Sequence, residues 1–211
     1  MCAFPRIDDY LRGETVLTLL GLFNRLDLCL AYFWNLPYVH RMGALGKDVK
    51  LGRGLRIEGP EFMFLGDRVR ISDYCRFAIQ TVNRQTGSPA IALSPRLAIG
   101  DDSYVGSFSV FSCMSEISIG RNVAIADHCY IGDLYHGFEN MDLPPAEQYL
   151  QSHGPVRIGD GAWIGAKVSV LSGVTIGKRC VIGANSVVTS DIPDYHVAAG
   201  APARVIRRIG P

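Results

Sequence analysis

An aliphatic or aromatic residue recurs at every sixth position over most of this chain, and this repeat restricts the possible folds more than any other feature. It fills fourteen positions in four runs, and glycine follows it at nine of them. The fourth residue after it is mostly small or β-branched. The fourteen positions are Leu65, Ile71, Ile99, Val105, Phe111, Ile119, Ile125, Ile131, Ile158, Ile164, Val170, Ile176, Ile182 and Val188.

A six-residue period predicts short strands joined by tight turns. Six is a multiple of the two-residue period of a strand and does not match the 3.6-residue period of a helix, so only strands keep this column on one side. We expect each hexad to form one strand and one corner, with glycine permitting the backbone geometry of the corner. Three hexads would make one coil, and stacked coils would bury a continuous core as solenoids do. The sequence therefore predicts an all-β fold.

Length, charge and cysteine usage narrow the class of protein. The 211 residues suit one sizeable domain, and the net charge of +1 argues against nucleic acid as the main partner. The six cysteines are scattered without a C-x-x-C pair, which indicates a reduced, intracellular protein without a disulfide framework. Cys75, Cys129 and Cys180 fall on the small position of the repeat, so we expect them to fill the core rather than to act as nucleophiles.

The N-terminal part, residues 1–44, lies outside the repeat and is expected to be helical. It lacks the basic flank and small-residue cleavage site of a secretory signal. Residues 16–36 are apolar, but Asn24, Arg25 and Asp27 lie in their middle, and a helix that spans a membrane would bury them at high cost. A helix or helix pair that lies on the protein's own body or at a membrane surface fits better, which leaves peripheral membrane contact open.

Two interruptions break the repeat, at about residues 80–96 and 137–155. Both are rich in polar residues, glycine and proline, so they are expected to be loops that leave a coil. Long loops on a rigid scaffold often carry function. Tyr135 places a bulky ring where the repeat expects a small residue, and His136 follows it directly. His136 is therefore the first residue that the core does not constrain.

The repeat and the closing residues resemble the hexapeptide-repeat acyltransferases, whose fold is a left-handed parallel β-helix, an exception to the right-handed crossover preference. Within that family, the last fifty-odd residues look most like the galactoside and maltose O-acetyltransferases. The matching runs are Pro155-Val-Arg-Ile-Gly-Asp-Gly-Ala-Trp-Ile-Gly-Ala166, Gly173-Val-Thr-Ile-Gly177, Val181-Ile-Gly-Ala184, Val187-Val-Thr-Ser-Asp-Ile-Pro193 and Val197-Ala-Ala-Gly-Ala-Pro-Ala-Arg-Val-Ile206.

The resemblance implies an organisation and a set of partners. Residues 45–193 would form the β-helix acetyltransferase domain, and residues 194–211 a tail that completes the coenzyme A site. It implies acetyl-CoA as acyl donor, no metal, and a homotrimer, because the coenzyme groove needs a neighbouring subunit. The N-terminal apolar segment followed by Arg41-Met-Gly-Ala-Leu-Gly-Lys-Asp-Val49 also looks like bacterial surface-polysaccharide O-acetyltransferases. That likeness favours a glycan or its precursor over a free small sugar, and a cytoplasmic location.

Transfer of an acetyl group from a thioester to a sugar hydroxyl needs a base, and a histidine with a pKa near 6.5 suits that task. In the family, the catalytic histidine stands where a coil gives way to the loop before the Trp-Ile-Gly run, and His136 matches that position. Ser107 is the candidate oxyanion donor, although the family pattern would have asparagine there. His128 and His153 compete for a catalytic role. Asp133 and Glu139 are the nearest carboxylates that could orient the His136 ring.

The resemblance also implies a set of coenzyme-binding positions along the last coils. Small residues would flank the pantetheine arm, and arginines would meet the phosphates as forked donors. Serine stands at position 190 where a phosphate-contacting lysine would be expected. The implied coenzyme-binding residues are Trp163, Ala166, Ala184, Thr189, Ser190, Arg204 and Arg207.

Three alternatives remain open from the sequence. A related enzyme could acetylate the amine of an amino sugar or of a nucleotide-linked amino sugar, since amine and hydroxyl acceptors place similar demands on His136. A γ-carbonic-anhydrase-like metal enzyme would need three histidines that converge on zinc, two of them a few residues apart, whereas His128 and His136 are eight apart. A non-catalytic β-helix scaffold would bind nothing along Trp163 to Arg207.

Overall fold

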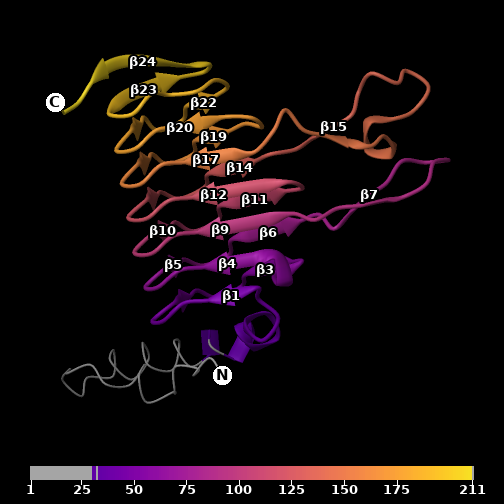
Figure 1. The fold of residues 1–211 in the computed structure, drawn as a ribbon, viewed down its shortest axis with the longest axis horizontal. Helices are drawn as coiled ribbons and strands as arrows, with labels where there is room; N and C mark the ends of the chain where they lie inside the picture. The colour runs from indigo at the N-terminus through magenta and orange to yellow at the C-terminus, as the bar shows by residue number, and fades with distance from the viewer. Residues whose placement is uncertain (1–29, 32, 211) are drawn as a thin grey trace.

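The computed structural model describes residues 30–31 and 33–210 of the chain. Residues 30–31 and 33–39 are helical, and the expected helices of residues 1–29 lie outside the described part. From residue 44 onward the chain winds as a stack of short strands, with the N-terminal coil at one end and the C-terminal strands at the other (Figure 1). Within the described residues, no helix is long and apolar enough to cross a membrane.

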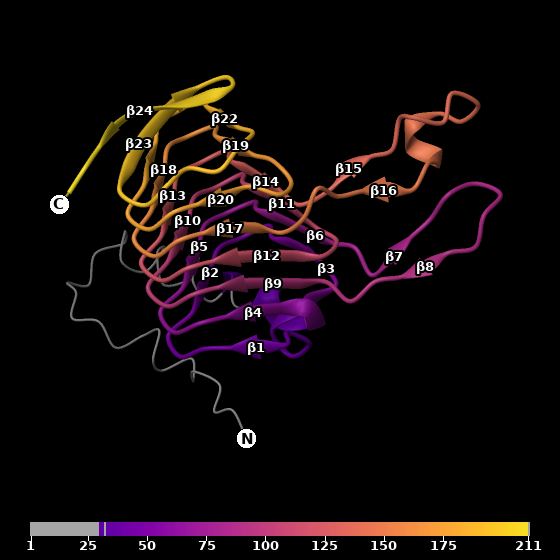
Figure 2. The same cartoon turned by 45° about the horizontal axis from the view of Figure 1, so that its top comes forward.

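The stack is a parallel β-helix with three walls (Figure 2). The first sheet contains β1 (Ala44–Leu45), β4 (Met63–Leu65), β9 (Arg96–Ile99), β12 (Glu116–Ile119), β17 (Val156–Ile158) and β20 (Thr175–Ile176). The second contains β2 (Lys50–Leu51), β5 (Arg70–Ile71), β10 (Tyr104–Val105), β13 (Ala124–Ile125), β18 (Trp163–Ile164), β21 (Val181–Ile182), β23 (His196–Gly200) and β24 (Ala203–Arg208). The third contains β3 (Arg56–Glu58), β6 (Arg76–Ile79), β11 (Val110–Cys113), β14 (Tyr130–Gly132), β19 (Ser169–Val170) and β22 (Val187–Val188).

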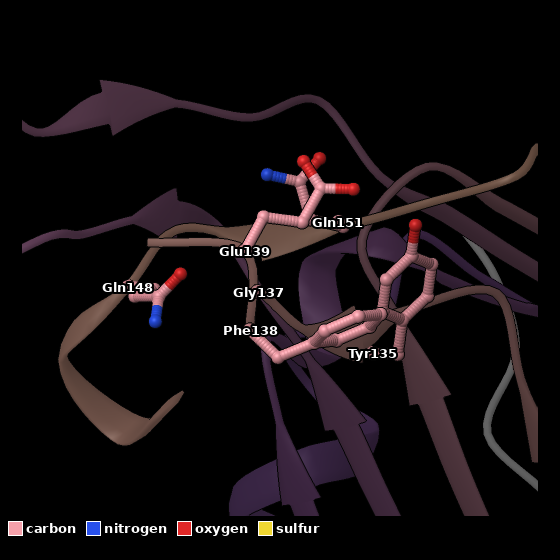
Figure 3. A pocket seen from close by; sticks show the side chains of 6 residues that line it. All are labelled: Tyr135, Gly137, Phe138, Glu139, Gln148 and Gln151. Atoms are coloured by element: carbon pink, nitrogen blue, oxygen red, sulfur yellow. The ribbon is translucent and has the colours of Figure 1, made fainter. Parts of the chain in front are cut away.

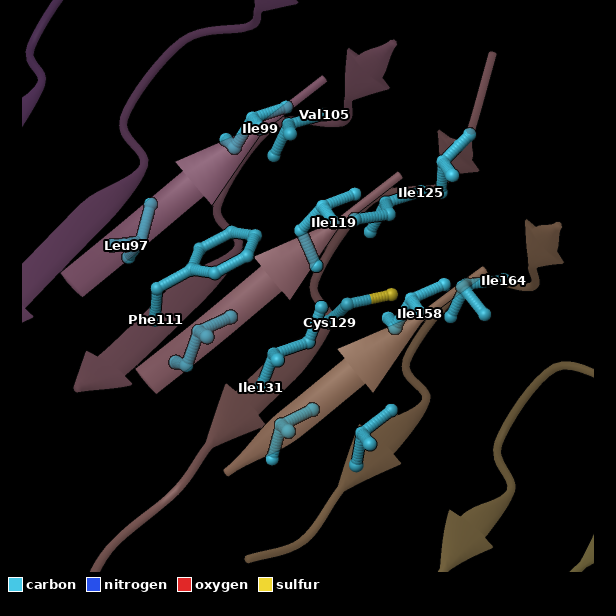
Figure 4. Close-up of a cluster of buried hydrophobic side chains, with 14 of the residues drawn as sticks. Leu97, Ile99, Val105, Phe111, Ile119, Ile125, Cys129, Ile131, Ile158 and Ile164 are labelled. Carbon is cyan, nitrogen blue, oxygen red and sulfur yellow. The ribbon is translucent and has the colours of Figure 1, made fainter. Parts of the chain in front are cut away.

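The two columns of the repeat form the core, as predicted. All fourteen hexad positions are at most 3% exposed, and those that Figure 4 labels point into the space between the walls. The small column is buried as well, including Cys75, Cys129 and Cys180. Its serines stay buried because the backbone satisfies them: Ser103 Oγ donates to the Gly120 carbonyl at 2.9 Å and accepts from the Val123 N–H at 3.0 Å.

The corners of the coils do not owe their backbone conformation to the glycines of the repeat, contrary to the expectation. The left-handed backbone conformation falls three positions after the buried column, on residues such as Asp102, Asn122 and Asn185. The glycines that directly follow the column do not have positive φ. They are needed for space instead, because a Cβ at Gly100 would lie only 2.8 Å from the carbonyl carbon of Gly120 in the next coil. The repeat was therefore right, but the physical reason given for its glycines was wrong.

Aspartates at the corners tie each coil to the next. Asp67 accepts from the backbone N–H of Lys47 at 2.8 Å, and Asp127 accepts from that of Ser107 at 2.7 Å. Arg121 N donates to Asp160 at 2.8 Å, and this bond lowers the pKa of the Asp160 carboxyl. Charged acceptors make the stronger class of hydrogen bonds, so these carboxylates help to fix the spacing of the coils.

Both interruptions of the repeat leave the third sheet at its end and form hairpins that lie side by side (Figure 2). Residues 80–95 contain β7 (Val82–Asn83) and β8 (Ile91–Ala92). Residues 133–155 contain β15 (Tyr135–His136), the 3-10 turn Pro145–Glu147 and β16 (Leu150–Gln151). The second interruption thus begins at residue 133, four residues before the expected boundary at 137. We call these two segments together the arm.

The C-terminal segment, predicted as a tail over residues 194–211, forms the strands β23 and β24. Val197 and Ala198 of β23 pair in parallel with Val181 and Ile182 of β21, which adds a further rung to the second sheet. β24 then turns back and pairs antiparallel with β23. Residues 194–208 therefore close the end of the β-helix.

Candidate active site and cofactor groove

His136 lies outside the core at the start of the arm. It is exposed, it belongs to β15, and its antiparallel partner on β16 is Leu150. Within the described part of the chain, the His136 side chain makes no hydrogen bond or ion pair, so its ring nitrogens are uncommitted. The β15–β16 hairpin therefore presents an exposed imidazole that is available to accept a proton.

A small cavity of about 60 Å³ lies beside β15 (Figure 3). Tyr135 and Gly137 line it, and successive residues of a strand face opposite sides, so the His136 side chain projects from the other face of the hairpin. Glu139 and Gln151 also line this cavity. Glu139 therefore belongs to the wall of the cavity and makes no hydrogen bond to His136.

Asp133, the other carboxylate considered for orienting His136, has a different role. Its side chain is fully buried and accepts from the backbone N–H groups of Met114 at 2.7 Å, Ser115 at 2.8 Å and Glu116 at 2.6 Å. It also accepts from Ser115 Oγ at 2.8 Å. The carboxylate thus holds the turn between β11 and β12 where the arm begins, and the period of the repeat gives no sign of this.

Ser107 and His136 lie at opposite ends of the third sheet. Ser107 precedes β11, His136 follows β14, and these two strands are parallel neighbours. Four residues of strand separate the two ends, roughly 13 Å. A single chain therefore does not bring these two predicted residues together.

The competing histidines are engaged in ring contacts. The His128 ring stacks on Phe108 with 5.0 Å between centroids, and Phe108 stacks on Tyr74 at 5.4 Å. The His153 ring lies 4.8 Å from that of Tyr135. Among the residues that the structure describes, none stacks on the His136 ring, which leaves this histidine freer to act than His128 or His153.

Four predicted coenzyme residues and Ser107 fall into two groups at the two ends of the third sheet. Ala166 and Ala184 lie at the corner that precedes the sheet, as does Ser107, and Ala166 O accepts from Asn185 N at 2.9 Å. Thr189 and Ser190 are exposed and follow β22, at the end where His136 leaves β14. β22 and β14 are two strand spacings apart, roughly 10 Å.

Trp163 and Arg207 lie in one row across the second sheet. Trp163 pairs with Val181, Val181 with Val197, and Val197 with Arg207. This row spans roughly 14 Å, and Trp163 is 57% exposed. Arg204 is also exposed and lies on β24, where it pairs with Ala199. An open depression of about 480 Å³ adjoins the row at Val181, between Arg179 and Tyr195.

The buried cysteines are not expected to act as nucleophiles. Burial raises the pKa of Cys75 to about 11 and that of Cys113 to about 12, so both are neutral thiols near pH 7. Burial also raises the pKa values of Cys129 and Cys180. Among residues 30–31 and 33–210, no three His, Cys, Asp or Glu side chains form a group that could hold a metal ion.

Comparison with known proteins identifies the family. Residues 155–190 match the family profile described as bacterial transferase hexapeptide (six repeats). The chain is 30% identical over 182 residues to a protein named as an O-acetyl transferase of lipopolysaccharide biosynthesis, WbbJ, from Escherichia coli, covering 81% of this chain and 75% of that protein. The chain belongs to the hexapeptide-repeat acetyltransferases.

A second relative, named as an acetyltransferase from Mycobacterium tuberculosis, is 40% identical over 162 residues. That match covers 75% of this chain but 49% of the relative, so the chain spans about half the length of some curated relatives that it matches.

Solved structures share the fold. The N-acyltransferase AntD from Bacillus cereus, in complex with dTDP and 3-hydroxybutyryl-CoA, has a TM-score of 0.65 at 20% identity and covers 82% of this chain and 86% of its own. A maltose O-acetyltransferase from Clostridium difficile has a TM-score of 0.55 at 25% identity, covering 99% of this chain and 100% of its own. These likenesses support the expected left-handed winding of the β-helix.

Proposed function

We propose that the chain is an acetyl-CoA-dependent O-acetyltransferase that modifies a hydroxyl of a sugar, in a surface polysaccharide or its precursor. The observation that carries this proposal is the uncommitted His136 ring on the arm. The name of the Escherichia coli relative, with its reference to lipopolysaccharide biosynthesis, supports a glycan acceptor.

The reaction would proceed by direct transfer. The oxygen of the acceptor hydroxyl attacks the thioester carbonyl carbon and forms the new C–O bond, while His136 takes the hydroxyl proton. The C–S bond then breaks, and the imidazolium returns the proton to the thiolate, which leaves as CoA–SH. The buried cysteines have raised pKa values and no access, so an acyl-cysteine route through them is disfavoured.

The predicted site residues lie at opposite ends of the third sheet, which supports a site shared between the subunits of a homotrimer. Ser107, Ala166 and Ala184 lie at one end of the third sheet, and His136, Thr189 and Ser190 at the other. If a neighbouring subunit placed its Ser107 end beside the His136 end of this chain, residues of both subunits would line one groove. In that groove Ser107 would serve as oxyanion donor, and Trp163, Arg204 and Arg207 would line the path of the coenzyme.

An acceptor panel tests the proposal. The protein would be incubated with acetyl-CoA and either glycan precursors, neutral sugars or amino sugars, with thiol release and product mass recorded. We expect an alkali-labile ester on a hydroxyl acceptor. Faster formation of an alkali-stable amide on an amino sugar would replace the proposal by N-acetylation, and absence of turnover and of acetyl-CoA binding would support a scaffold.

A further inference from the structure

The two halves of the arm are joined at the strand that holds His136. Asn83 lies on β7, in a segment that the sequence marks only as a polar loop, yet it is 5% exposed. Its Nδ2 donates to the Leu150 carbonyl at 2.9 Å, and its Oδ1 accepts from the Leu150 N–H at 2.8 Å. Leu150 is 67 positions away in sequence and is the β16 partner of His136.

The chemistry of the carboxamide explains why an asparagine fits this position. A carboxamide offers a donor and an acceptor side by side, as a peptide group does, so Asn83 bonds the backbone of β16 as a residue of a further strand would. An isolated two-stranded hairpin is marginally stable in water, and β15–β16 has two paired positions. The rung from Asn83 therefore supplies support that the hairpin lacks by itself.

Other contacts between the halves lie farther from His136. Thr86 N donates to the Glu147 carbonyl at 2.9 Å, and Tyr149 N donates to Gln85 Oε1 at 3.4 Å. The Tyr149 hydroxyl donates to the Pro89 carbonyl. Asn83 is the residue that holds the partner of His136 by two bonds.

We propose that Asn83 is a positioning residue for His136, and that residues 80–95 thereby set the orientation of the catalytic hairpin. This inference rests on the proposed role of His136 as base. Asn83 acts through Leu150 and not by contact with the imidazole, so its loss would alter the rate of the chemical step more than the affinity for acetyl-CoA.

The test compares N83A with N140A in the full-length protein. Asn140 is a carboxamide of the same arm, but within the described part of the chain its side chain bonds only Asp142 N, in its own turn, at 2.9 Å. We expect amide exchange of residues 133–139 and 148–152 to rise about tenfold in N83A and to stay unchanged in N140A. We also expect kcat of N83A to fall roughly 10- to 100-fold with KM for acetyl-CoA within about twofold of wild type.

A second variant, N83D, keeps the size and the acceptor of the side chain and removes the donor to Leu150, so it serves if N83A folds poorly. Unchanged exchange in the hairpin of a folded variant would overturn the inference whatever the activity. Raised exchange with unchanged kcat would overturn the positioning role. Wild-type activity in H136A would refute the proposed base instead, and the exchange result would still decide whether Asn83 holds the hairpin.

Discussion

The coils and the arm are both built from strands of two to six residues, but different interactions hold them together. In the coils the strands from β3 onward add buried side chains to a column that runs through the stack, and Leu45 of β1 and Leu51 of β2 pack against its N-terminal end as partly buried residues. In the arm, polar side chains and backbone groups join the two hairpins, and Phe138 and Met141 near its tip are exposed. A repeated apolar environment gives a rigid body, and a non-repeating polar one leaves side chains available for chemistry.

The same substitution in both regions would give the largest contrast in stability. Ile164 is fully buried in β18, whereas Ile91 on β8 is 48% exposed. We expect I164A to lower the free energy of unfolding by about 2–5 kcal/mol, because it leaves a cavity in a continuous core. I91A should change it by less than about 0.5 kcal/mol. Denaturant titration measures both, and equal effects would show that the arm is as tightly packed as the coils.

A substitution at Asp133, where the arm leaves the coils, should have an intermediate effect on the free energy of unfolding. Replacing Asp133 by alanine leaves the backbone donors of Met114, Ser115 and Glu116 without their acceptor. We expect a loss of about 1–3 kcal/mol in the free energy of unfolding, together with a reduced kcat, because the arm starts at this residue. Thermal unfolding and turnover would be measured on one preparation. A variant that matches wild type in both would show that the turn does not need this carboxylate.

Substitutions in the proposed coenzyme groove on the coils should change the binding of acetyl-CoA and not the stability of the fold. We expect R207A to raise KM for acetyl-CoA about threefold to tenfold, with a smaller effect at high salt, because its phosphate contact would be exposed and screened. R208A is the control, since the next residue of the strand faces the opposite way. Equal KM values for the two variants would remove Arg207 from the proposed groove.

The smallest effect is expected from treatment of the folded protein with an alkylating reagent, because the thiols of the core are buried. Iodoacetamide at pH 8 should leave Cys75, Cys113, Cys129 and Cys180 unlabelled in the folded protein and label all four in guanidinium, as peptide mass spectrometry would show. A thiol whose folded pKa is raised stabilises the fold below its ordinary pKa of 9.0. That contribution is lost as the pH rises through about 11 for Cys75 and about 12 for Cys113. Labelling of any of the four in the folded state would contradict the packing of the small column.

The coils could be predicted from the sequence because each coil buries an apolar side chain at the same positions of the hexad. The six-residue period gave the buried column, the buried cysteines and the place where each interruption begins to within a few residues. The role of the glycines was misjudged, since the space between coils at Gly100 depends on Gly120, which lies twenty positions away.

The arm could be predicted only in part. His136 was predicted as the base from its place at the end of a coil and from a family resemblance, and this role stays a prediction. The roles of Asn83 and Asp133 were not predicted, because each side chain binds backbone groups that lie 17 to 67 positions away in the sequence. One asparagine in a polar loop gives no sign of the strand that it will meet.

The most direct test of the account is to measure kcat and the melting temperature of H136A beside those of H128A. Both residues are exposed histidines, but His128 stacks on Phe108 at a corner of the coils and His136 lies on the arm. The account predicts that H136A loses about 100-fold or more in kcat without a change in melting temperature, and that H128A keeps its activity. If H136A turns over within a few fold of wild type, the arm does not supply the base, and the central claim is wrong.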